Sequence, residues 1–451
     1  MQFTFLTYIP FLISICFGTL LVNTLFINKK SDRIINFLLG GGIGLGVSSH
    51  ATFLSYVLFN QLNVNFVIGL NIAMLIITSI VYVTACRRQH QPIIRFSFAD
   101  LKHLWPFLII TLFSLPFWYE GHFYLNGGWD AWSVWNLKAK FLFLGTENWK
   151  AIFNPLMWRS SPHYPLLLPM INVYGWSFLG EPNPLIPCTT AALLTFLLTG
   201  LLTFSLIRLT KSYYAVICAP VLLTLPYFVK LCLSQYADVA VGYYLLASVV
   251  CLIFAQKENN KVYALLSGIM VGLLSFTKSE ALVAALLLTL LGGLFLIWKQ
   301  PWKDVKWTVI CFLGACVIGL LPAAAFKIFF SPGNQTFING LLSAEKPADL
   351  MRVKIIFSFY LMELISPNWN GLWIVLSALL IFAVKRIFSR ELLIIPAFIF
   401  CYAGIITAYY FINTYFVVDW WLMVSFHRII YAIIPTVILW TFYAVFKKKQ
   451  L

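Results

Sequence analysis

The chain has 451 residues, of which 61% are hydrophobic and 10% charged, with a formal net charge of +16. A soluble domain has roughly 25% charged residues because its surface must be solvated, so this composition excludes a soluble enzyme and a disordered chain. Apolar runs of about 20 residues recur throughout, and each is long enough to cross a hydrocarbon core of about 30 Å. The alternating pattern of barrel strands does not occur. The sequence therefore predicts an all-α, polytopic integral membrane protein.

The apolar runs predict about thirteen transmembrane helices, at residues 4–27, 34–60, 65–85, 104–119, 184–207, 213–231, 238–256, 262–277, 281–298, 307–330, 371–385, 392–411 and 428–446. With the N-terminus outside, the predicted cytoplasmic loops hold 20 of the 31 basic residues but 5 of the 15 acidic ones. This asymmetry is the positive-inside rule, so the charge indicates topology and not a nucleic-acid partner. We expect a multi-pass protein of a bacterial inner or plasma membrane, with its site facing the periplasm or exterior.

Three parts are expected along the chain. Residues 1–103 form a three-helix N-terminal extension, in which the glycines between Gly40 and Gly46 predict close helix packing. Residues 104–330 form a membrane core with a long outer loop at 120–183. Residues 331–451 hold a second outer loop, at 331–370, and three further helices. The first span lacks a basic leader region and a small-residue cleavage site, which favours a retained helix.

The outer loop at 120–183 contains two expected helices. The apolar run from Tyr164 to Leu179 would reverse the sidedness of every later basic loop if it crossed the membrane, so we expect an interfacial or re-entrant helix. Around Asp130, a helical pattern places Trp132, Trp135, Ala139 and Leu142 on one face. That pattern is typical of a helix lying in the membrane interface. Asp130 is then either incidental to an anchoring helix or functional, and an aspartate so close to hydrocarbon favours function.

Further ionisable residues are expected at the same membrane depth. Asp238 begins a predicted span, where a carboxylate is either a helix cap or a functional group. Lys278 and Glu280 lie in a short turn between two apolar runs, where they either neutralise each other or bind a ligand.

Two histidine motifs complete the set of candidates. His427 and Arg428 are expected to open the last span from outside, where an arginine either reaches lipid headgroups or serves a site. His163, followed by Tyr164 and Pro165, opens the predicted interfacial helix, and a lone histidine there is either structural or functional. Acids for proton transfer and cations for phosphate are thus expected together at headgroup level. The nine cysteines show no metal-binding or disulfide spacing.

The order of these motifs resembles a known family. The matching pieces are Gly128-Trp129-Asp130, His163-Tyr164-Pro165, Ser234-Gln235-Tyr236-Ala237-Asp238 and Gly272-Leu273-Leu274-Ser275-Phe276-Thr277-Lys278. They resemble the GT-C fold membrane glycosyltransferases that use polyprenyl-phosphate sugars, a glycosyltransferase family 39-like group with protein O-mannosyltransferases and the lipid A aminoarabinose transferase. The resemblance covers residues 104–330, is weaker over 331–451 and is absent over 1–103. Many relatives have a second acid soon after the first, whereas Ala131 and Trp132 follow Asp130 here, so no metal or other cofactor is expected.

The resemblance implies transfer of a sugar from a polyprenyl-phosphate donor to a hydroxyl of an envelope lipid, glycan or protein, with inversion. Asp130 is then the expected general base and Asp238 the second catalytic candidate. The expected substrate-binding residues are Trp129, Trp132, His163, Tyr164, Lys278, Glu280, Arg352, His427 and Arg428. Trp135 is a further candidate for stacking on a sugar, and Lys354 for holding the lipid carrier.

Three other functions stay open on the sequence. A transporter or flippase of lipid-linked saccharides predicts ionisable groups near the membrane midplane and broken helices in matched halves. A ligase that takes a preassembled glycan from a lipid diphosphate predicts a similar outer site. A noncatalytic assembly subunit predicts that neutralising Asp130 leaves product formation unchanged.

Overall fold

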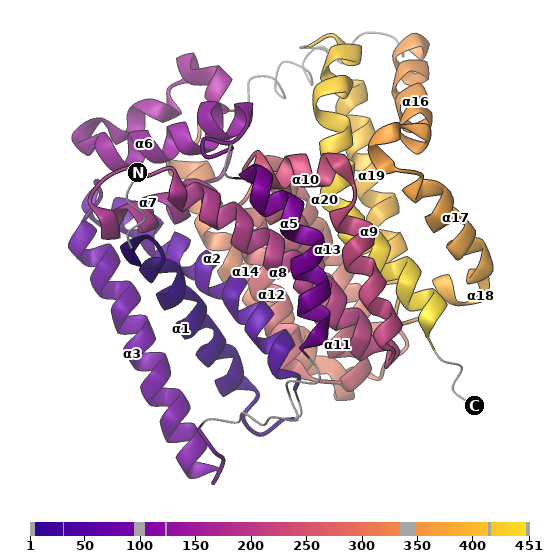
Figure 1. Ribbon diagram of the computed structural model, residues 1–451, viewed down its shortest axis with the longest axis horizontal. Helices are drawn as coiled ribbons and strands as arrows, with labels where there is room; N and C mark the ends of the chain where they lie inside the picture. Colours follow the sequence, from indigo (N-terminus) through magenta and orange to yellow (C-terminus); the bar gives the residue numbers. More distant parts are fainter. Residues whose placement is uncertain are drawn as a thin grey trace.

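The computed structural model describes residues 5–29, 31–93, 104–121, 124–333, 349–413 and 416–447. These residues form helices and connections without any strand, which confirms the all-α prediction (Figure 1). The α-helices are α1 (Ile9–Leu25), α2 (Arg33–Phe59), α3 (Val64–Arg88), α5 (Trp105–Gly121), α6 (Asn136–Leu144), α7 (Leu167–Leu179), α8 (Leu185–Thr210), α9 (Cys218–Leu223), α10 (Pro226–Leu233), α11 (Ala237–Glu258), α12 (Lys261–Ser275), α13 (Ser279–Ile297), α14 (Trp302–Phe329), α16 (Leu350–Ile365), α17 (Leu372–Phe382), α18 (Val384–Ile387), α19 (Ile394–Ile412) and α20 (Val418–Phe446).

Nine of the helices in the described residues are long and apolar enough to cross a membrane, which supports a multi-pass membrane protein. A tenth span is possible if the pair Tyr213–Leu223 and Pro226–Leu233, bent by 72°, crosses as one. The other predicted spans form shorter helices, of 17 residues in α5, 15 in α12 and 11 in α17. The predicted total of thirteen therefore stays a prediction.

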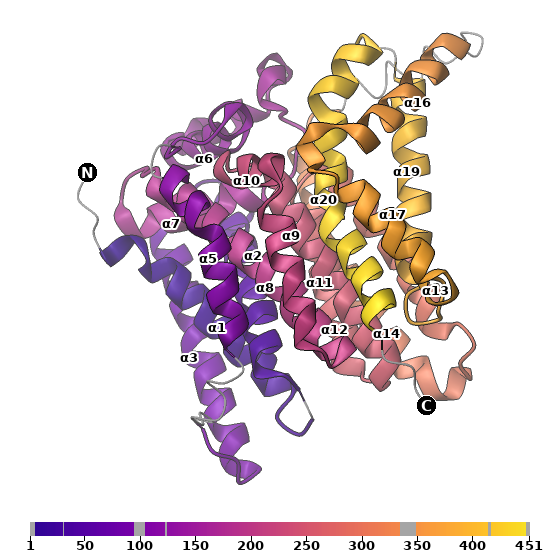
Figure 2. The same cartoon turned by 45° about the vertical axis from the view of Figure 1, so that its right-hand side comes forward.

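Helix α11 lies at the centre of the bundle, and its 18 most apolar consecutive residues are all buried. Helices α1 to α3 pack on one side of the bundle, and α16 to α20 lie on the opposite side (Figures 1 and 2). Close packing of α1 on α2 depends on glycine, as predicted. A Cβ atom on Gly44 would lie 1.9 Å from the carbonyl oxygen of Ser14, and one on Gly40 would lie 2.5 Å from Cα of Thr19. Small residues of this kind let helix backbones approach within a membrane.

The segment that follows α5 covers one end of the bundle (Figure 1). It consists of a π-helical turn at Ala131–Trp135, then α6, two 3₁₀ helices at Thr146–Phe153 and Pro155–Ser160, and α7. With 13 residues, α7 is shorter than a membrane span, in agreement with the expectation that it does not cross. Most of α7 is buried by neighbouring protein.

The predicted single face of Trp132, Trp135, Ala139 and Leu142 is wrong in one respect. Trp135, Ala139 and Leu142 are buried, but Trp132 is exposed and packs edge-on against Trp129. A π-helical turn contains more residues per turn than an α-helix, so positions around it do not follow the 3.6-residue period that the prediction assumed.

The predicted start of the last span at Arg428 is also wrong, because α20 begins ten residues earlier, at Val418. His427 and Arg428 therefore lie inside a continuous helix. The polar side chains of this turn have partners within the protein, so they do not mark a helix end. Ser425 bonds to the hydroxyl of Tyr410 at 2.7 Å, and His427 bonds to the hydroxyl of Tyr227.

Candidate active site

Asp130 and Asp238 are brought together by contacts between their own segments. Backbone N–H of Gly128 donates to the carbonyl of Ser234 at 3.0 Å, and the side-chain amide of Gln235 donates to the carbonyl of Leu125 at 2.9 Å. These bonds fasten the loop before Asp130 to the residues before α11. Gly127 has a positive φ of 68°, and a Cβ atom there would lie 2.6 Å from Cβ of Ala131, so glycine is required at this turn.

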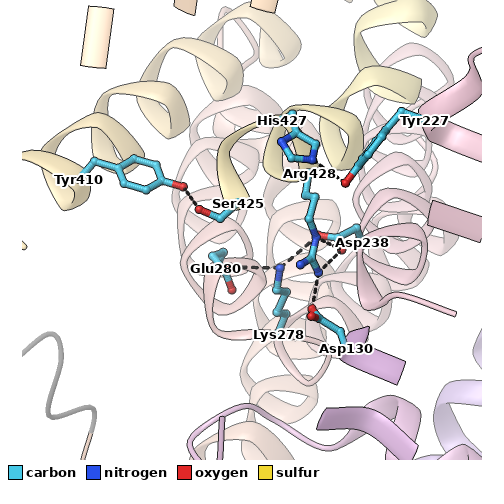
Figure 3. A network of polar contacts seen from close by, with 9 residues as sticks. All are labelled: Asp130, Tyr227, Asp238, Lys278, Glu280, Tyr410, Ser425, His427 and Arg428. Carbon is cyan, nitrogen blue, oxygen red and sulfur yellow. Dashed lines mark hydrogen bonds and ion pairs between the residues drawn. The ribbon is translucent and has the colours of Figure 1, made fainter. Parts of the chain in front are cut away.

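Arg428 lies between the two aspartates (Figure 3). Its Nη2 atom donates to Oδ2 of Asp130 at 2.6 Å and to Oδ2 of Asp238 at 2.9 Å, while its Nε atom donates to the same Asp238 oxygen at 3.2 Å. The guanidinium also lies over the ring of Tyr236, 4.4 Å from the ring centre. Helix α20 thus supplies one cation to carboxylates that come from two other segments.

Lys278, the N-cap residue of α13, and Glu280, in the first turn of that helix, extend this cluster (Figure 3). The ammonium of Lys278 donates to Oδ1 of Asp238 at 3.1 Å and pairs with Oε1 of Glu280 at 3.2 Å. Burial lowers the pKa of Lys278, but the carboxylates of Asp238 and Glu280 outweigh burial and hold the pKa above its ordinary value. Lys278 is therefore charged at neutral pH. The second carboxylate oxygen of Glu280 is buried without a hydrogen-bond partner among the described residues.

The two aspartates differ in exposure. The Asp238 side chain is 3% exposed and bonds to two cations, whereas the Asp130 side chain is 19% exposed and bonds to one. Asp238 does not cap α11 with its side chain, because the cap residue is Tyr236 and makes no side-chain cap bond. Asp238 is thus suited to hold Lys278 and Arg428 in place, while Asp130 is the more accessible carboxylate.

His163 and Tyr164 lie beside the cluster together with two lysines that the sequence analysis did not single out. Tyr164 stacks on Trp135 with ring centres 5.6 Å apart, and Lys138 lies 5.5 Å from the centres of both rings. Lys138 is fully buried and donates to the carbonyl of Ser161 at 2.6 Å. Burial, followed by the charge of Lys327, holds the pKa of Lys138 well below its ordinary value.

Lys327 reaches the same motif from α14, where its ammonium donates to the carbonyl of His163. Burial, followed by the neighbouring charges of Lys327 and Lys138, lowers the pKa of His163 to about 3. His163 is therefore neutral at physiological pH. The sequence contained a signal for the burial of Lys138. It follows Trp135 by three residues and precedes Leu142 by four, a spacing that places all three on one face of a helix.

Other predicted residues lie elsewhere. Arg352 donates from its Nε atom to the carbonyl of Tyr410 at 2.9 Å and from its Nη2 atom to that of Asn413, so it fastens α16 to the end of α19. Lys354 is exposed on α16. Trp129 and Trp132 form an exposed pair next to Asp130, whereas Trp135 is buried and its face is covered by Tyr164.

The cluster of Asp130, Asp238, Lys278, Glu280 and Arg428 joins three acids with two cations. Within the described residues, no group of three His, Cys, Asp or Glu side chains is placed to hold a metal ion. Each of the three acids instead faces a lysine or an arginine. Such a cluster can accept a proton at one carboxylate and stabilise an anion at the cations.

No model of a protein family, no curated protein and no solved structure matches this chain.

Proposed function

We propose that the protein is a membrane glycosyltransferase that moves a sugar from a polyprenyl-phosphate donor to a hydroxyl acceptor. The observation that carries the proposal is the convergence of Asp130, Asp238, Lys278 and Arg428 from four distant segments at one end of an apolar helix bundle. The ion pairs support a site that combines a reachable carboxylate with two fixed cations. A donor with an apolar tail could approach such a site from the lipid.

In the proposed reaction, Asp130 is the general base. Its carboxylate takes the proton from the acceptor hydroxyl while the hydroxyl oxygen attacks the anomeric carbon of the sugar. The bond from that carbon to the phosphate oxygen breaks, and the polyprenyl phosphate leaves with the electron pair. One displacement inverts the anomeric configuration. A positioned base contributes roughly 10²–10⁴-fold to such a step.

Lys278 and Arg428 stabilise the charge that develops on the leaving phosphate in this proposal. Arginine presents a planar fork of donors that matches a phosphate, and both groups are already fixed by Asp238. Arg428 also bonds to Asp130, so a phosphate on the guanidinium would compete with that carboxylate. Donor binding would then free Asp130 to act on the acceptor. We assign Asp238 the role of a positioning residue, and no metal ion has a part in the proposal.

The acceptor lies on an envelope lipid, glycan or protein, at the outer face of a bacterial inner or plasma membrane. This placement rests on the charge asymmetry of the loops and on the end of the bundle at which the cluster lies.

The test is transfer by the purified protein in lipid nanodiscs. A panel of short-chain prenyl-phosphate sugars is supplied with a membrane extract, and mass spectrometry follows both the glycosylated product and the free prenyl phosphate. The proposal expects both products from at least one prenyl-phosphate sugar and none from nucleotide sugars. Envelope glycolipids and glycoproteins compared with and without the protein then identify the acceptor. A lipid-linked saccharide that accumulates with its sugar attached, without any hydrolysed or transferred product, would instead favour a flippase.

A further inference from the structure

A small cavity is lined in part by Tyr236, the residue whose ring lies under Arg428 of the ion cluster. It has a volume of about 10 Å³, which is room for one water-sized group, and Trp135, Asn136, Asn172, Gln235 and Tyr236 are among the residues that line it. The rest of its lining is apolar apart from a threonine, and no lining residue is charged.

Two residues of this lining each have a buried polar atom without a hydrogen-bond partner among the described residues. The indole N–H of Trp135, a donor, and Oδ1 of Asn172, an acceptor, are both unpaired, although the residues are only 1% and 2% exposed. A buried polar group without a partner costs roughly 1–3 kcal/mol. An unpaired donor and an unpaired acceptor on two residues that line one cavity therefore favour an occupant that can both accept and donate a hydrogen bond.

A chain of hydrogen bonds between side-chain amides sets the orientation of the Asn172 amide. The amide of Gln235 must donate to the carbonyl of Leu125, which fixes its own oxygen as the acceptor for Asn136 at 3.1 Å. The oxygen of Asn136 in turn accepts from Nδ2 of Asn172 at 3.0 Å. Because each step determines the next, Asn172 is left with its oxygen unpaired, and the assignment does not depend on an arbitrary amide flip.

We propose that this cavity binds a hydroxyl group of a sugar, with the indole N–H of Trp135 donating a hydrogen bond to its oxygen and Oδ1 of Asn172 accepting a hydrogen bond from its O–H. An uncharged hydroxyl suits a lining without charge, and it fills the space of one water molecule. The cavity adjoins the cluster through Tyr236. This residue lines the cavity, and its ring also lies under the guanidinium of Arg428. The inference rests on the proposed function, and it adds that one substrate carries a second hydroxyl beside the reacting centre.

The chain offers a matched pair of tryptophans for the test. Trp176 is as buried as Trp135, but its indole N–H donates to the carbonyl of Asn183 at 2.9 Å. Trp135→Phe removes a donor that has no partner in the described part of the chain, whereas Trp176→Phe leaves a carbonyl without its donor. Ala191→Leu places extra bulk in the cavity lining and retains Trp135.

The measurement is the dissociation constant of three probes on the protein in nanodiscs, namely a neutral alkyl glycoside, a short-chain prenyl-phosphate sugar, and the same prenyl phosphate without sugar. The alkyl glycoside and the prenyl-phosphate sugar are each supplied as a small panel whose members differ in the sugar. Trp135→Phe is expected to weaken binding of a sugar-bearing probe about fivefold to tenfold, which is the loss of one hydrogen bond. Ala191→Leu should weaken it at least as much. Trp176→Phe should lower the melting temperature and leave the affinity unchanged.

Weakening confined to the alkyl glycoside assigns the hydroxyl to the acceptor, and weakening confined to the prenyl-phosphate sugar assigns it to the donor. The sugar-free prenyl phosphate should bind equally to all variants. Unchanged affinity for every sugar-bearing probe in Trp135→Phe and Ala191→Leu, or no binding of these probes to the unaltered protein, would overturn the inference and leave the cavity to a structural water. Because these are binding measurements, they remain distinguishable from a failure of sugar transfer.

Discussion

Asp130 and Asp238 share one guanidinium, because Nη2 of Arg428 lies 2.6 Å from the first carboxylate and 2.9 Å from the second. The three residues are separated by more than 100 positions along the chain, and the contact joins the loop after α5, the start of α11 and the middle of α20. The ion cluster is therefore both a candidate reaction centre and a fastening between distant helices.

The first prediction concerns this fastening. Arg428→Met retains most of the side-chain volume but leaves two carboxylates without their shared cation. Breaking a buried ion pair from one side costs roughly 3–5 kcal/mol, so the melting temperature in detergent should fall strongly. Adding Asp238→Asn to Arg428→Met should recover part of the loss, since one uncompensated charge is then removed. Equal melting temperatures for the unaltered protein and Arg428→Met would contradict the buried network.

A second prediction tests the packing of α1 on α2. Gly44→Ala places a Cβ atom 1.9 Å from the carbonyl oxygen of Ser14, so the helices must separate. Overpacking of this kind costs roughly 1–3 kcal/mol. Gly69→Ala in α3 is the matched control, because its Cβ atom would meet nothing within 4 Å. Thermal unfolding should show a loss for Gly44→Ala and none for Gly69→Ala, and a similar loss in both would refute the close approach.

The third prediction concerns pH. The pKa of His163 is about 3 in the folded protein, mainly through burial, and about 6.5 in an unfolded chain. Between these values the unfolded state binds more protons, so stability is fully present above pH 6.5 and is lost as the pH falls towards 3. His163→Gln cannot take up that proton, and its melting temperature should therefore fall less between pH 7 and pH 5 than that of the unaltered protein. The same fall in both proteins would exclude His163 as the group responsible.

The fourth prediction tests which side the site faces. Leu156 is 85% exposed in the 3₁₀ helix Pro155–Ser160, while Ser160 at the end of that helix is 4% exposed and unsuitable for labelling. In intact cells, Leu156→Cys should react with an impermeant thiol reagent, and a cysteine at the exposed Lys303 should react only after the membrane is opened. The exposed Cys16 and Cys401 are first replaced by serine. The reverse labelling pattern would place the site in the cytoplasm.

Much of the fold could be predicted from apolar runs, because burial in lipid and burial in protein both select the same residues. For that reason hydropathy did not separate full spans from the shorter α12 and α17, whose lengths depend on tertiary packing. The start of α20 was misplaced because polar residues at 425–428 resemble a helix boundary. Their partners come from other helices, and no local pattern contains that information.

The charged residues of the candidate site could be picked out in the sequence, but the ion pairs that they form with one another could not. Asp130, Asp238, Lys278 and Arg428 are conspicuous because charge is rare in this chain. That one arginine would hold both aspartates depends on the approach of α20 to α11. The unpaired atoms of Trp135 and Asn172 were not predictable, since both residues occur in runs typical of packed helices.

The two aspartates have different proposed tasks, and paired variants that each neutralise one of them test this difference. The measurement is the turnover of a prenyl-phosphate sugar by Asp130→Asn and Asp238→Asn, with donor affinity and melting temperature recorded for each. Asp130→Asn should lower turnover by roughly two to four orders of magnitude while donor binding and folding persist, because only proton acceptance is lost. Asp238→Asn should weaken donor binding and lower the melting temperature, because Lys278 and Arg428 lose their common partner. Transfer at an unchanged rate by Asp130→Asn would contradict the central claim.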